Sequence, residues 1–302
     1  MKPSQPKRTD LSGVDAATRA AVLVEALPYI RRFADATVVV KLGGNAMVDP
    51  ELSHQFAADI VLMRAVGLKP VVVHGGGPQI GHLMAQLGKE PEFRDGLRVT
   101  DAETLDIARM VLGGRVNREI VSAINRHHRQ AVGLSGEDAG LIVARQRDAA
   151  LGYVGDVVDV NRTIIDTLLS GGFIPVISTI GADDHGQAFN INADTAAIAL
   201  AAAVGAEKLV YLTDVAGVLT DVADPTSLVS HLSATRARLL IADGVIRGGM
   251  IPKVEACLAA IEQGVPSAHV LDGRIPHVVL LELFTDSGVG TMITRTDGMD
   301  TT

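Results

Sequence analysis

The sequence predicts an α/β protein with a mainly parallel central sheet and helices on both of its faces. Short apolar segments alternate along the chain with longer amphipathic ones, which is the rhythm of successive βαβ units. Two of the apolar segments run directly into glycines, at Gly43-Gly44 and at Gly75-Gly76-Gly77. With 302 residues, 47% of them hydrophobic and only 3% aromatic, the chain can bury a large aliphatic core.

The first expected element is a helix that precedes the sheet. Residues 1–14 are mostly polar and contain two prolines, which is typical of a disordered tail. A helical pattern follows over residues 15–34, with Asp15 as a plausible N-cap. Pro28 lacks a backbone donor and should kink this helix. A doubly wound sheet does not need such a leader, so we expect the helix to pack on something else.

The elements of the sheet and its covering helices follow in alternation. Short apolar runs predict strands at residues 38–40, 70–73, 141–144, 154–160, 174–178, 209–212 and 268–271. Apolar spacing of three and four predicts helices at residues 53–66, 78–87, 101–127, 161–169, 193–204, 233–242, 252–263 and 277–284. Residues 133–140 are expected to form a loop. A polar hairpin near residues 180–190 is the favoured boundary between two lobes.

Composition excludes several classes of function. The formal net charge of -8 argues against nucleic acid or an anionic membrane as the main partner. No run reaches the roughly 18 apolar residues of a membrane span, and the polar start has no apolar signal segment. We therefore expect a soluble cytoplasmic protein. The single Cys257 can form neither an internal disulfide nor a thiolate metal site, and the nine histidines show no metal spacing, so no protein metal site is expected.

The two glycine turns predict an anion-binding site. Both follow apolar strands, so both lie at the carboxyl ends of parallel strands, where ligands bind. Glycine lets a backbone N–H approach an oxyanion without a Cβ in the way. Either turn alone could be structural, but the pair, one of them preceded by Lys41, favours an anion. Neither turn matches GxxxxGK[ST] or GxGxxG, which argues against P-loop ATPases and dinucleotide enzymes.

Two lysines make phosphoryl transfer the favoured chemistry. Lys41 ends a strand that is otherwise valine, and burying its charge without an anion would be costly. Lys253 lies in a second glycine-flanked turn, GGMIPKV. Convergent ammoniums and free backbone amides are what a polyphosphate requires. Asp194 is either a helix N-cap or a carboxylate that organises both lysines, and we favour the second because the ammoniums need a counter-charge before substrate arrives.

Further polar residues suit substrate recognition. The planar fork of Arg98 could hold a carboxylate, or it could form a structural salt bridge with Asp101. Asn190 and Asn192 offer amide donors in the motif FNINAD. A nucleotide-binding edge is expected after the strand at 209–212, at Thr213, Asp214 and Gly217.

These motifs together resemble the amino acid kinase family, and within it the branch that phosphorylates N-acetyl-L-glutamate. The resemblance covers residues 23–293 and is carried by VVVKLGGNAM, VVHGGGPQI, DGLRVTD, NINAD, YLTDVAGVL, GGMIPKV and GVGTMI. It implies a three-layer αβα sandwich in two lobes, preceded by a kinked helix. Residues 1–35 would be the tail and an oligomerisation helix, residues 36–187 would bind the acceptor, and residues 188–302 would bind the nucleotide.

The resemblance also implies an activity: ATP-dependent phosphorylation of the side-chain carboxylate of N-acetyl-L-glutamate, in arginine biosynthesis. Lys41 and Lys253 would stabilise the transferring group and Asp194 would orient them. Acceptor binding would involve Gly76, Gly77, Arg98 and Asn190. ATP binding would involve Lys41, Gly43, Gly44, Thr213, Asp214, Gly217 and Lys253. Mg²⁺ would be bound by the ATP phosphates rather than by a site made of protein ligands.

Regulation and assembly are further implications of the resemblance. Members with a kinked leader helix are arginine-sensitive hexamers, so the leader here implies a trimer of dimers inhibited by L-arginine. The effector site would be lined by Tyr29, Lys208, Glu282, Gly288 and Gly290.

Alternative functions remain at this stage. A kinase for a related carboxylate, such as an aminoadipate derivative, would share most of these motifs. A catalytically silent nucleotide-binding regulator is disfavoured because both lysines and Asp194 are present. A nicotinamide-dependent oxidoreductase is disfavoured because no GxGxxG opens the first helix.

Overall fold

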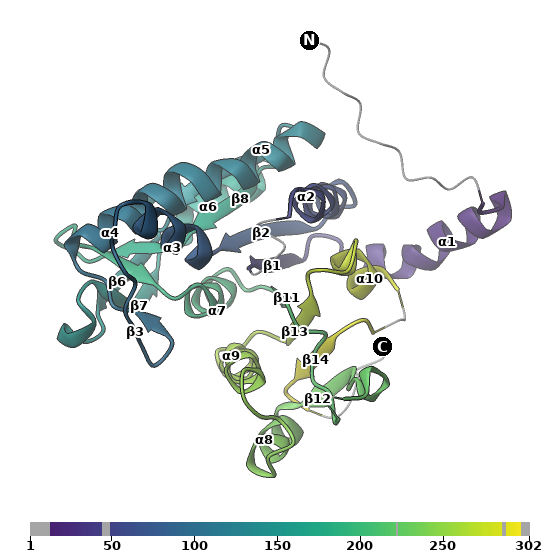
Figure 1. Ribbon diagram of the computed structural model, residues 1–302. Coiled ribbons are helices and arrows are strands. Elements are labelled where there is room, and N and C mark those ends of the chain that lie inside the picture. The colour runs from purple at the N-terminus through teal and green to yellow at the C-terminus, as the bar shows by residue number, and fades with distance from the viewer. Residues whose placement is uncertain (1–12, 44–48, 222, 286–287, 297–302) are drawn as a thin grey trace.

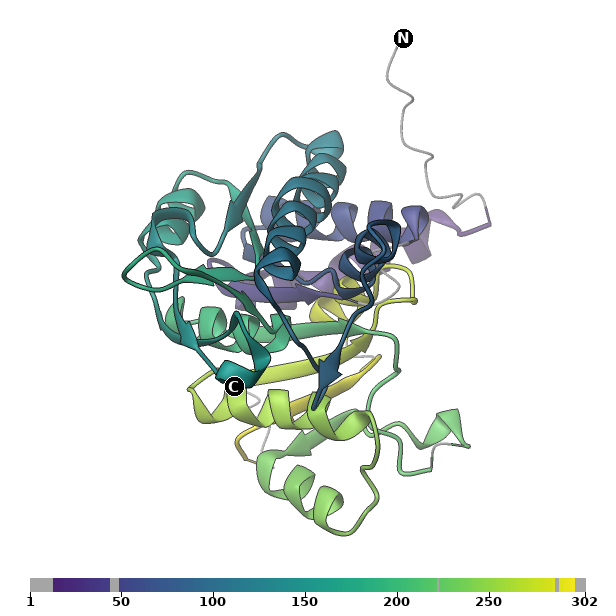
Figure 2. The ribbon, with the colours of Figure 1, turned by 60° about the vertical axis from the view of Figure 1, so that its left-hand side comes forward.

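A computed structural model of the chain describes residues 13–43, 49–221, 223–285 and 288–296. Its main element is an eight-stranded sheet with helices on both faces (Figures 1 and 2). In spatial order the strands are β12 (His231–Ser233), β14 (Thr291–Thr294), β13 (Ser267–Asp272), β11 (Lys208–Thr213), β1 (Thr37–Leu42), β2 (Lys69–His74), β8 (Ile174–Ser178) and β5 (Ala131–Ser135). Neighbours from β13 to β5 pair in parallel, and β14 runs antiparallel to β13. The predicted three-layer α/β fold with a mainly parallel sheet is confirmed.

Alternate residues of the central strands face two separate cores. Val38 and Val40 of β1 pack into one core and Val39 into the other, because successive side chains of a strand point to opposite faces. Strands buried on both faces are continuous apolar runs, as in this sequence. The first core is covered by α2 (Pro50–Ala65), α5 (Asn117–His127) and α10 (Val278–Phe284). The second is covered by α6 (Thr163–Ser170), α7 (Ala193–Ala203), α8 (Ala234–Ala242) and α9 (Met250–Glu262).

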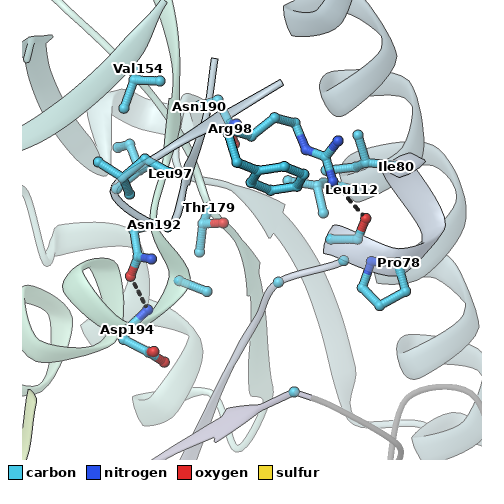
Figure 3. A pocket seen from close by; sticks show the side chains of 18 of the residues that line it. Pro78, Ile80, Leu97, Arg98, Leu112, Val154, Thr179, Asn190, Asn192 and Asp194 are labelled. Atoms are coloured by element: carbon cyan, nitrogen blue, oxygen red, sulfur yellow. Dashed lines mark hydrogen bonds between the residues drawn. The ribbon is translucent and has the colours of Figure 1, made fainter. Parts of the chain in front are cut away.

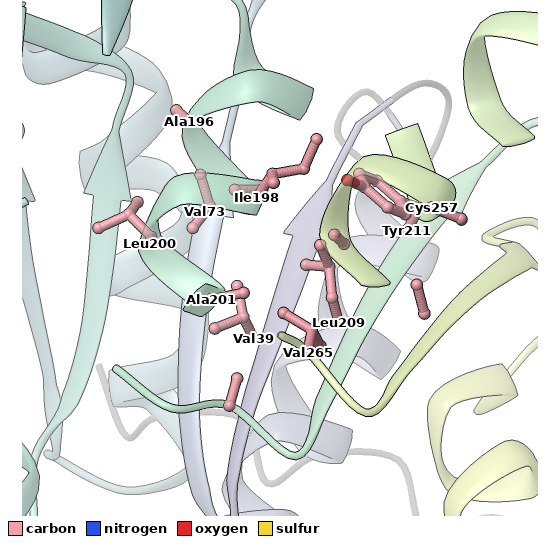
Figure 4. Packing of buried hydrophobic residues seen from close by; sticks show 14 of the residues in the cluster. Val39, Val73, Ala196, Ile198, Leu200, Ala201, Leu209, Tyr211, Cys257 and Val265 are labelled. Carbon is pink, nitrogen blue, oxygen red and sulfur yellow. The ribbon is translucent and has the colours of Figure 1, made fainter. Parts of the chain in front are cut away.

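The alanine-rich helix α7 crosses the middle of the sheet. Figure 4 shows its Ala196, Leu200 and Ala201 against Val39 of β1 and Val73 of β2. Small side chains let the helix lie close to the strands. This contact fixes the N-terminal end of α7 beside the carboxyl ends of β1 and β2.

A small closed barrel stands beside the main sheet. It consists of β6 (Ile142–Gln146), β7 (Val154–Val160), β9 (Ile180–Ala182) and β10 (Ala188–Ile191). β9 and β10 form the predicted polar hairpin. β6 and β7 precede β8 in the chain, whereas β9 follows β8 and β10 leads into α7. A second short hairpin pairs β3 (Phe93–Arg94) with β4 (Leu97–Arg98).

The helix predicted over residues 101–127 contains an irregularity that the sequence did not indicate. Asp101 caps it as expected, accepting from the N–H of Thr104 at 2.8 Å. After α4 (Ala102–Arg109) the chain follows a π-helical segment, Met110–Val116, before α5 begins. Such segments are rare and are often found at functional sites.

The prediction of a loop at residues 133–140 is wrong for residues 133–135. Ala131–Ser135 forms β5, the edge strand beside β8. A Cβ on Gly133 would lie 1.9 Å from side-chain atoms of both Asn117 and Arg118, so this glycine marks a close approach and not a turn. The strands β3, β4, β12 and β14 were also not predicted; they are two to four residues long.

The leader helix α1 (Ala16–Arg32) begins after its predicted N-cap, Asp15, which accepts from the N–H groups of Ala17 and Thr18. None of its residues is buried, and its apolar residues include Leu23, 74% exposed, and Leu27, 50% exposed. Its C-terminal end packs beside α10 (Figure 1). Within the described residues, no helix has the length and apolar character that crossing a membrane requires.

Candidate active site

A cavity of about 250 Å³ opens at the carboxyl ends of β1 and β2. Figure 3 shows Arg98, Asn190 and Asp194 around it. Seven residues expected from the sequence to act in binding or catalysis line it: Lys41, Gly43, Gly76, Gly77, Arg98, Asn190 and Asp194. They come from four separate segments of the chain, so the fold gathers the motifs VVVKLGG, HGGGP, GLR and NINAD at one place.

Lys41 and Asp194 form the charged centre of the cavity. The Lys41 Nζ lies 2.9 Å from Asp194 Oδ1, and the Lys41 side chain is only 15% exposed. The pair has the distance of an ion pair without the angles of a hydrogen bond. It therefore acts through charge, and the ammonium keeps its N–H donors for a ligand.

The N-cap interpretation of Asp194 is wrong. Asn192 caps α7, because its Oδ1 accepts from the N–H groups of Asp194 and Thr195 at 2.9 and 3.1 Å. Asp194 is the second residue of the helix, where the positive end of the helix dipole stabilises a carboxylate. Its side chain is consequently free to face Lys41.

The second lysine has a different partner from the one expected. Lys253 lies in the first turn of α9, and its Nζ is 4.0 Å from Asp214 Oδ1. Within the described part of the chain it makes no ion pair with Asp194. Asp214 follows the end of β11, the strand that pairs with β1. Asp214 and its partner Lys253 thus lie at the carboxyl end of β11, and Lys41 lies near the carboxyl end of the neighbouring strand β1.

The other nucleotide-edge residues adjoin the same strand end. The Thr213 hydroxyl accepts from the N–H of Val215 at 3.2 Å, which shapes the turn after β11. Gly217 has a φ of 136°, and a Cβ there would lie 2.6 Å from the Thr291 hydroxyl. Only glycine fits this conformation readily. Gly44 lies outside the described residues.

Arg98 lies at the rim of the cavity and has no carboxylate partner among the residues that the structure describes. Its Nη2 donates to the Gly77 carbonyl at 3.0 Å, and its guanidinium lies 4.7 Å above the centre of the Phe93 ring. Asp101, the alternative partner, has its Oδ2 2.7 Å from Lys89 Nζ instead, so the interpretation of Arg98 as part of a structural salt bridge with Asp101 is wrong. Burial lowers the pKa of Arg98. Its Nη1 also donates to Met84 Sδ at 3.3 Å, and the N–H donors that neither bond uses are available to an anion.

The glycine turn after β2 presents backbone rather than side chains to the cavity. Gly77 begins α3 (Gly77–Gln86), whose free N–H groups lie at its N-terminal end. A Cβ on Gly76 would lie 2.6 Å from Leu112 Cδ2, so a side chain has no room there. Asn190 on β10 donates to the Thr100 hydroxyl at 3.2 Å, which fixes its amide at the opposite wall.

Sequence reasoning missed the residues beneath this turn. His74, the last residue of β2, is completely buried, and its Nδ1 lies 2.9 Å from the Gly75 carbonyl oxygen. Burial lowers the pKa of His74 to about 4. The imidazole also contacts Asn117, which follows the π-helical segment. A polar residue at the end of an apolar strand was the available signal.

The residues expected to bind an effector form a second polar cluster. Glu282 of α10 lies 2.8 Å from His269 Nδ1 and accepts from the N–H of Val289 at 3.3 Å. Lys208 Nζ lies 3.3 Å from His269 Nε2, and burial lowers the pKa of Lys208 to about 8. Burial likewise lowers the pKa of His269, which the sequence did not single out, to about 4.

Two other expected effector residues frame this cluster. Tyr29 of α1 packs half-buried against the core that contains α10. A Cβ on Gly290 would lie 2.3 Å from the Val270 carbonyl oxygen, so the segment containing Gly288 and Gly290 approaches β13 closely.

Comparisons with known proteins place the fold and its motifs in a family. Residues 36–272 match the Amino acid kinase family. The acetylglutamate kinase of Synechocystis sp. is 54% identical over 285 residues, covering 94% of this chain and 96% of that protein. The acetylglutamate kinase of Nostoc sp. is 56% identical over 278 residues, covering 92% of this chain and 94% of that protein.

Solved structures share the fold. N-acetylglutamate synthase from Neisseria gonorrhoeae, complexed with coenzyme A and N-acetyl-glutamate, matches with a TM-score of 0.80 and 29% identity. The match covers 92% of this chain and 64% of the synthase chain. Carbamate kinase from Giardia lamblia bound to AMP-PNP matches with a TM-score of 0.66 and 20% identity, covering 87% of this chain and all of that one.

Proposed function

The chain belongs to the amino acid kinase family, and from that membership we propose that it transfers the terminal phosphoryl group of ATP to the side-chain carboxylate of N-acetyl-L-glutamate. The products are N-acetyl-L-glutamyl 5-phosphate and ADP, and the reaction belongs to arginine biosynthesis. The observation that carries the proposal is the Lys41–Asp194 pair at the wall of a glycine-lined cavity. Identities of 54% and 56% to acetylglutamate kinases over more than nine-tenths of the chain support the choice of acceptor.

Catalysis by this site is positioning and charge neutralisation. The acceptor carboxylate is already ionised at neutral pH, so it needs no general base to become a nucleophile. Its attack on phosphorus spreads negative charge over the transferring oxygens, and Lys41 and Lys253 stabilise that charge. Asp194 holds Lys41 in place before the substrates arrive. Backbone N–H groups of Gly43, Gly44 and the Gly76 turn donate to phosphate and acceptor oxygens.

The two substrates bind to different parts of the chain. Residues 36–187 form the acceptor lobe, in which Arg98 and Gly77 hold the α-carboxylate together with Asn190 from the adjoining barrel. Residues 188–302 form the nucleotide lobe, in which ATP lies along the end of β11. Thr213, Asp214, Gly217 and Lys253 line this edge. The reaction takes place in the cytoplasm, in keeping with a biosynthetic enzyme.

Mg²⁺ accompanies ATP in this proposal. Mg²⁺ commonly keeps several waters and binds through substrate phosphates, so the ATP phosphates would hold it. Bound there, it would neutralise phosphate charge. The described residues contain no group of three or more histidine, cysteine or carboxylate side chains that could hold a metal ion.

L-Arginine inhibits the enzyme at the second polar cluster. Glu282 offers a buried carboxylate to the arginine guanidinium, and Lys208 lies within reach of its carboxylate. Tyr29, Gly288 and Gly290 complete the site where α1 meets α10. The exposed apolar residues of α1 support its exchange between subunits, which would link dimers into a hexamer. Deleting residues 1–34 should give an active dimer that ignores arginine; a truncated protein that remains hexameric and arginine-sensitive would contradict this.

Measuring ADP release across a panel of acyl-amino acids tests the activity. N-acetyl-L-glutamate should be turned over fastest, ahead of N-acetyl-L-aspartate and N-acetyl-L-aminoadipate by at least about tenfold. A matched Asp194→Asn variant, whose amide cannot balance the Lys41 charge, should lose most of this turnover. A faster rate with the aminoadipate derivative would make that the substrate. ATP binding without turnover of any acceptor would indicate a nucleotide-binding regulator.

A further inference from the structure

We propose that His74 and Asn117 are positioning residues that fix the glycine turn of the acceptor site, with His74 acting as a neutral Nδ1–H donor. Neither residue lines the cavity, so neither would touch a substrate. The inference deepens the proposed function, on which it rests. It concerns how the backbone of Gly75, Gly76 and Gly77 is held in the orientation that binds oxyanions.

The position of His74 couples the sheet to the turn. It is the last residue of β2, it is completely buried, and the next residue begins the turn. Its Nδ1 is 2.9 Å from the oxygen of the half-buried Gly75 carbonyl, and a backbone carbonyl at this depth pairs with a donor. A donated hydrogen bond here sets the plane of the peptide that links Gly75 to Gly76. That peptide carries the Gly76 N–H, one of the donors assigned to the acceptor.

The surrounding hydrogen bonds fix which imidazole nitrogen carries the proton. Asn117 Nδ2 lies 3.1 Å from His74 Nε2 and also donates to the Val176 carbonyl at 2.9 Å. The amide cannot be reversed, because the guanidinium of Arg118 donates to Asn117 Oδ1. Nδ2 is therefore the donor toward Nε2, and Nε2 must accept. The proton consequently resides on Nδ1 and points to Gly75.

The charge state agrees with this arrangement. His74 is buried, and the positive Arg118 is the charged group that acts on it. Burial and this charge lower the pKa of His74 to about 4, whereas the hydrogen bond to Gly75 opposes the shift. At neutral pH the ring is uncharged, so its Nε2 lone pair remains available to Asn117.

The π-helical segment explains how Asn117 reaches this place. Asn117 follows Met110–Val116 directly, and the wider turns of that segment change the direction in which the next side chain points. Leu112 and Val116 of the same segment pack against Gly76: a Cβ on Gly76 would lie 2.6 Å from Leu112 Cδ2 and 3.3 Å from Val116 Cγ2. One irregularity in a helix thus supports the turn twice, by a polar contact below and an apolar wall beside it.

Loss of the Nδ1–H donor should displace the Gly76 N–H. A misplacement of about 1 Å at a reacting centre can cost about a hundredfold in rate. We therefore expect turnover to depend on which nitrogen of the ring is replaced. A purely structural role predicts instead that turnover follows stability, whichever nitrogen is lost.

Two isosteric substitutions separate the nitrogens. His74→Asn places an amide N–H near the Nδ1 position and abandons Nε2, whereas His74→Gln retains an acceptor near Nε2 and abandons Nδ1. His74→Asn should keep kcat within about threefold of the parent. His74→Gln should lower kcat about 10- to 100-fold, with the KM for ATP changed less than about twofold. The exposed His128→Gln is the matched control and should leave kcat unchanged.

Two further measurements keep the inference testable if a variant is unstable. Thermal unfolding of the variants should show similar losses for Asn and Gln, so a drop in kcat that merely tracks the midpoint would overturn the inference. In the unaltered protein labelled with ¹⁵N-histidine, the His74 ring should show the Nδ1–H tautomer at all pH values from 5 to 8. His269, whose Nδ1 faces Glu282, is told apart from it because its signal persists in the His74 variants. An Nε2–H tautomer for His74, assigned by its loss in the variants, would also overturn it. The kcat of each variant relative to the parent can be measured with whichever acceptor the parent uses. A parent enzyme that fails to turn over N-acetyl-L-glutamate would therefore refute the proposed function and leave the inference about His74 to be tested with the true acceptor.

Discussion

Replacing Lys41 by methionine should remove transition-state stabilisation while leaving the fold intact. Methionine has a similar length and fills the mostly buried space of the lysine stem. The partner that loses its counter-charge is Asp194. Its side chain is 41% exposed as a whole, but Oδ1, the oxygen that faces Lys41, is buried. The free energy of unfolding should therefore fall by about 1–3 kcal/mol while the chain remains folded. The substitution isolates the ammonium as the group being tested.

The size of the effect follows from the geometry of the pair. Two unit charges about 3 Å apart interact by about 5 kcal/mol at an effective dielectric constant of about 20. Only the charge gained between the bound and transition states accelerates the reaction. If about half a charge develops on the oxygen that contacts Lys41, about 3 kcal/mol is lost, which corresponds to about a hundredfold in kcat.

Steady-state kinetics with both substrates varied will measure this loss. The kcat of Lys41→Met should fall about a hundredfold, and each KM should change less than about threefold. Lys69→Met is the control, because Lys69 makes a surface pair 3.4 Å from the exposed Asp35 and such pairs contribute little. Lys253→Met should behave like Lys41→Met. If ATP affinity collapses while turnover survives, the lysine binds ground-state phosphate and the reasoning is refuted.

Three other predictions concern the site and the buried histidines. Gly43→Ala should lower kcat about tenfold, because the new Cβ would lie 2.7 Å from the same ammonium; an unchanged kcat would show that the ammonium is not constrained. Arg98→Lys should raise the KM for the acceptor about tenfold and leave that for ATP unchanged, since a lysine lacks the planar fork; equal effects on both would contradict acceptor binding. The free energy of unfolding, measured in urea, should fall by about 1 kcal/mol for each pH unit between pH 6 and 4.5. The pKa values of His74 and His269 are lowered in the folded protein, so the unfolded chain binds about two more protons at these two residues in that range. The pKa of Asp59 is raised to about 6, so the folded protein binds about one more proton at that residue, which opposes the fall. Stability that is flat or rises on acidification would contradict those shifts.

Elements with a strong local pattern were predictable from the sequence. The strand at residues 154–160 was predicted with its observed bounds, and the central strands were found because they are unbroken apolar runs. The Lys41–Asp194 pair was also within reach, because a lysine in an apolar strand requires a nearby anion. These are cases in which local chemistry leaves few alternatives.

Features that depend on tertiary contacts were not predictable. Gly133 looks like a loop residue in the sequence, yet it lies in β5, where only a residue without a side chain can pass Asn117 and Arg118. Nothing in the apolar spacing of residues 101–127 indicates the π-helical segment. The pairing of Lys253 with Asp214 likewise depends on how α9 packs on β13, the strand next to β11, which sequence spacing does not determine.

Trapping the product with hydroxylamine tests the central claim most directly. An acyl phosphate reacts with hydroxylamine to give a hydroxamate on the carboxyl group that received the phosphate. With ATP, Mg²⁺ and N-acetyl-L-glutamate, mass spectrometry should find the hydroxamate at the side-chain carboxyl, in a one-to-one ratio with ADP. A hydroxamate at the α-carboxyl, or release of ADP with no hydroxamate, would contradict phosphoryl transfer to the side chain.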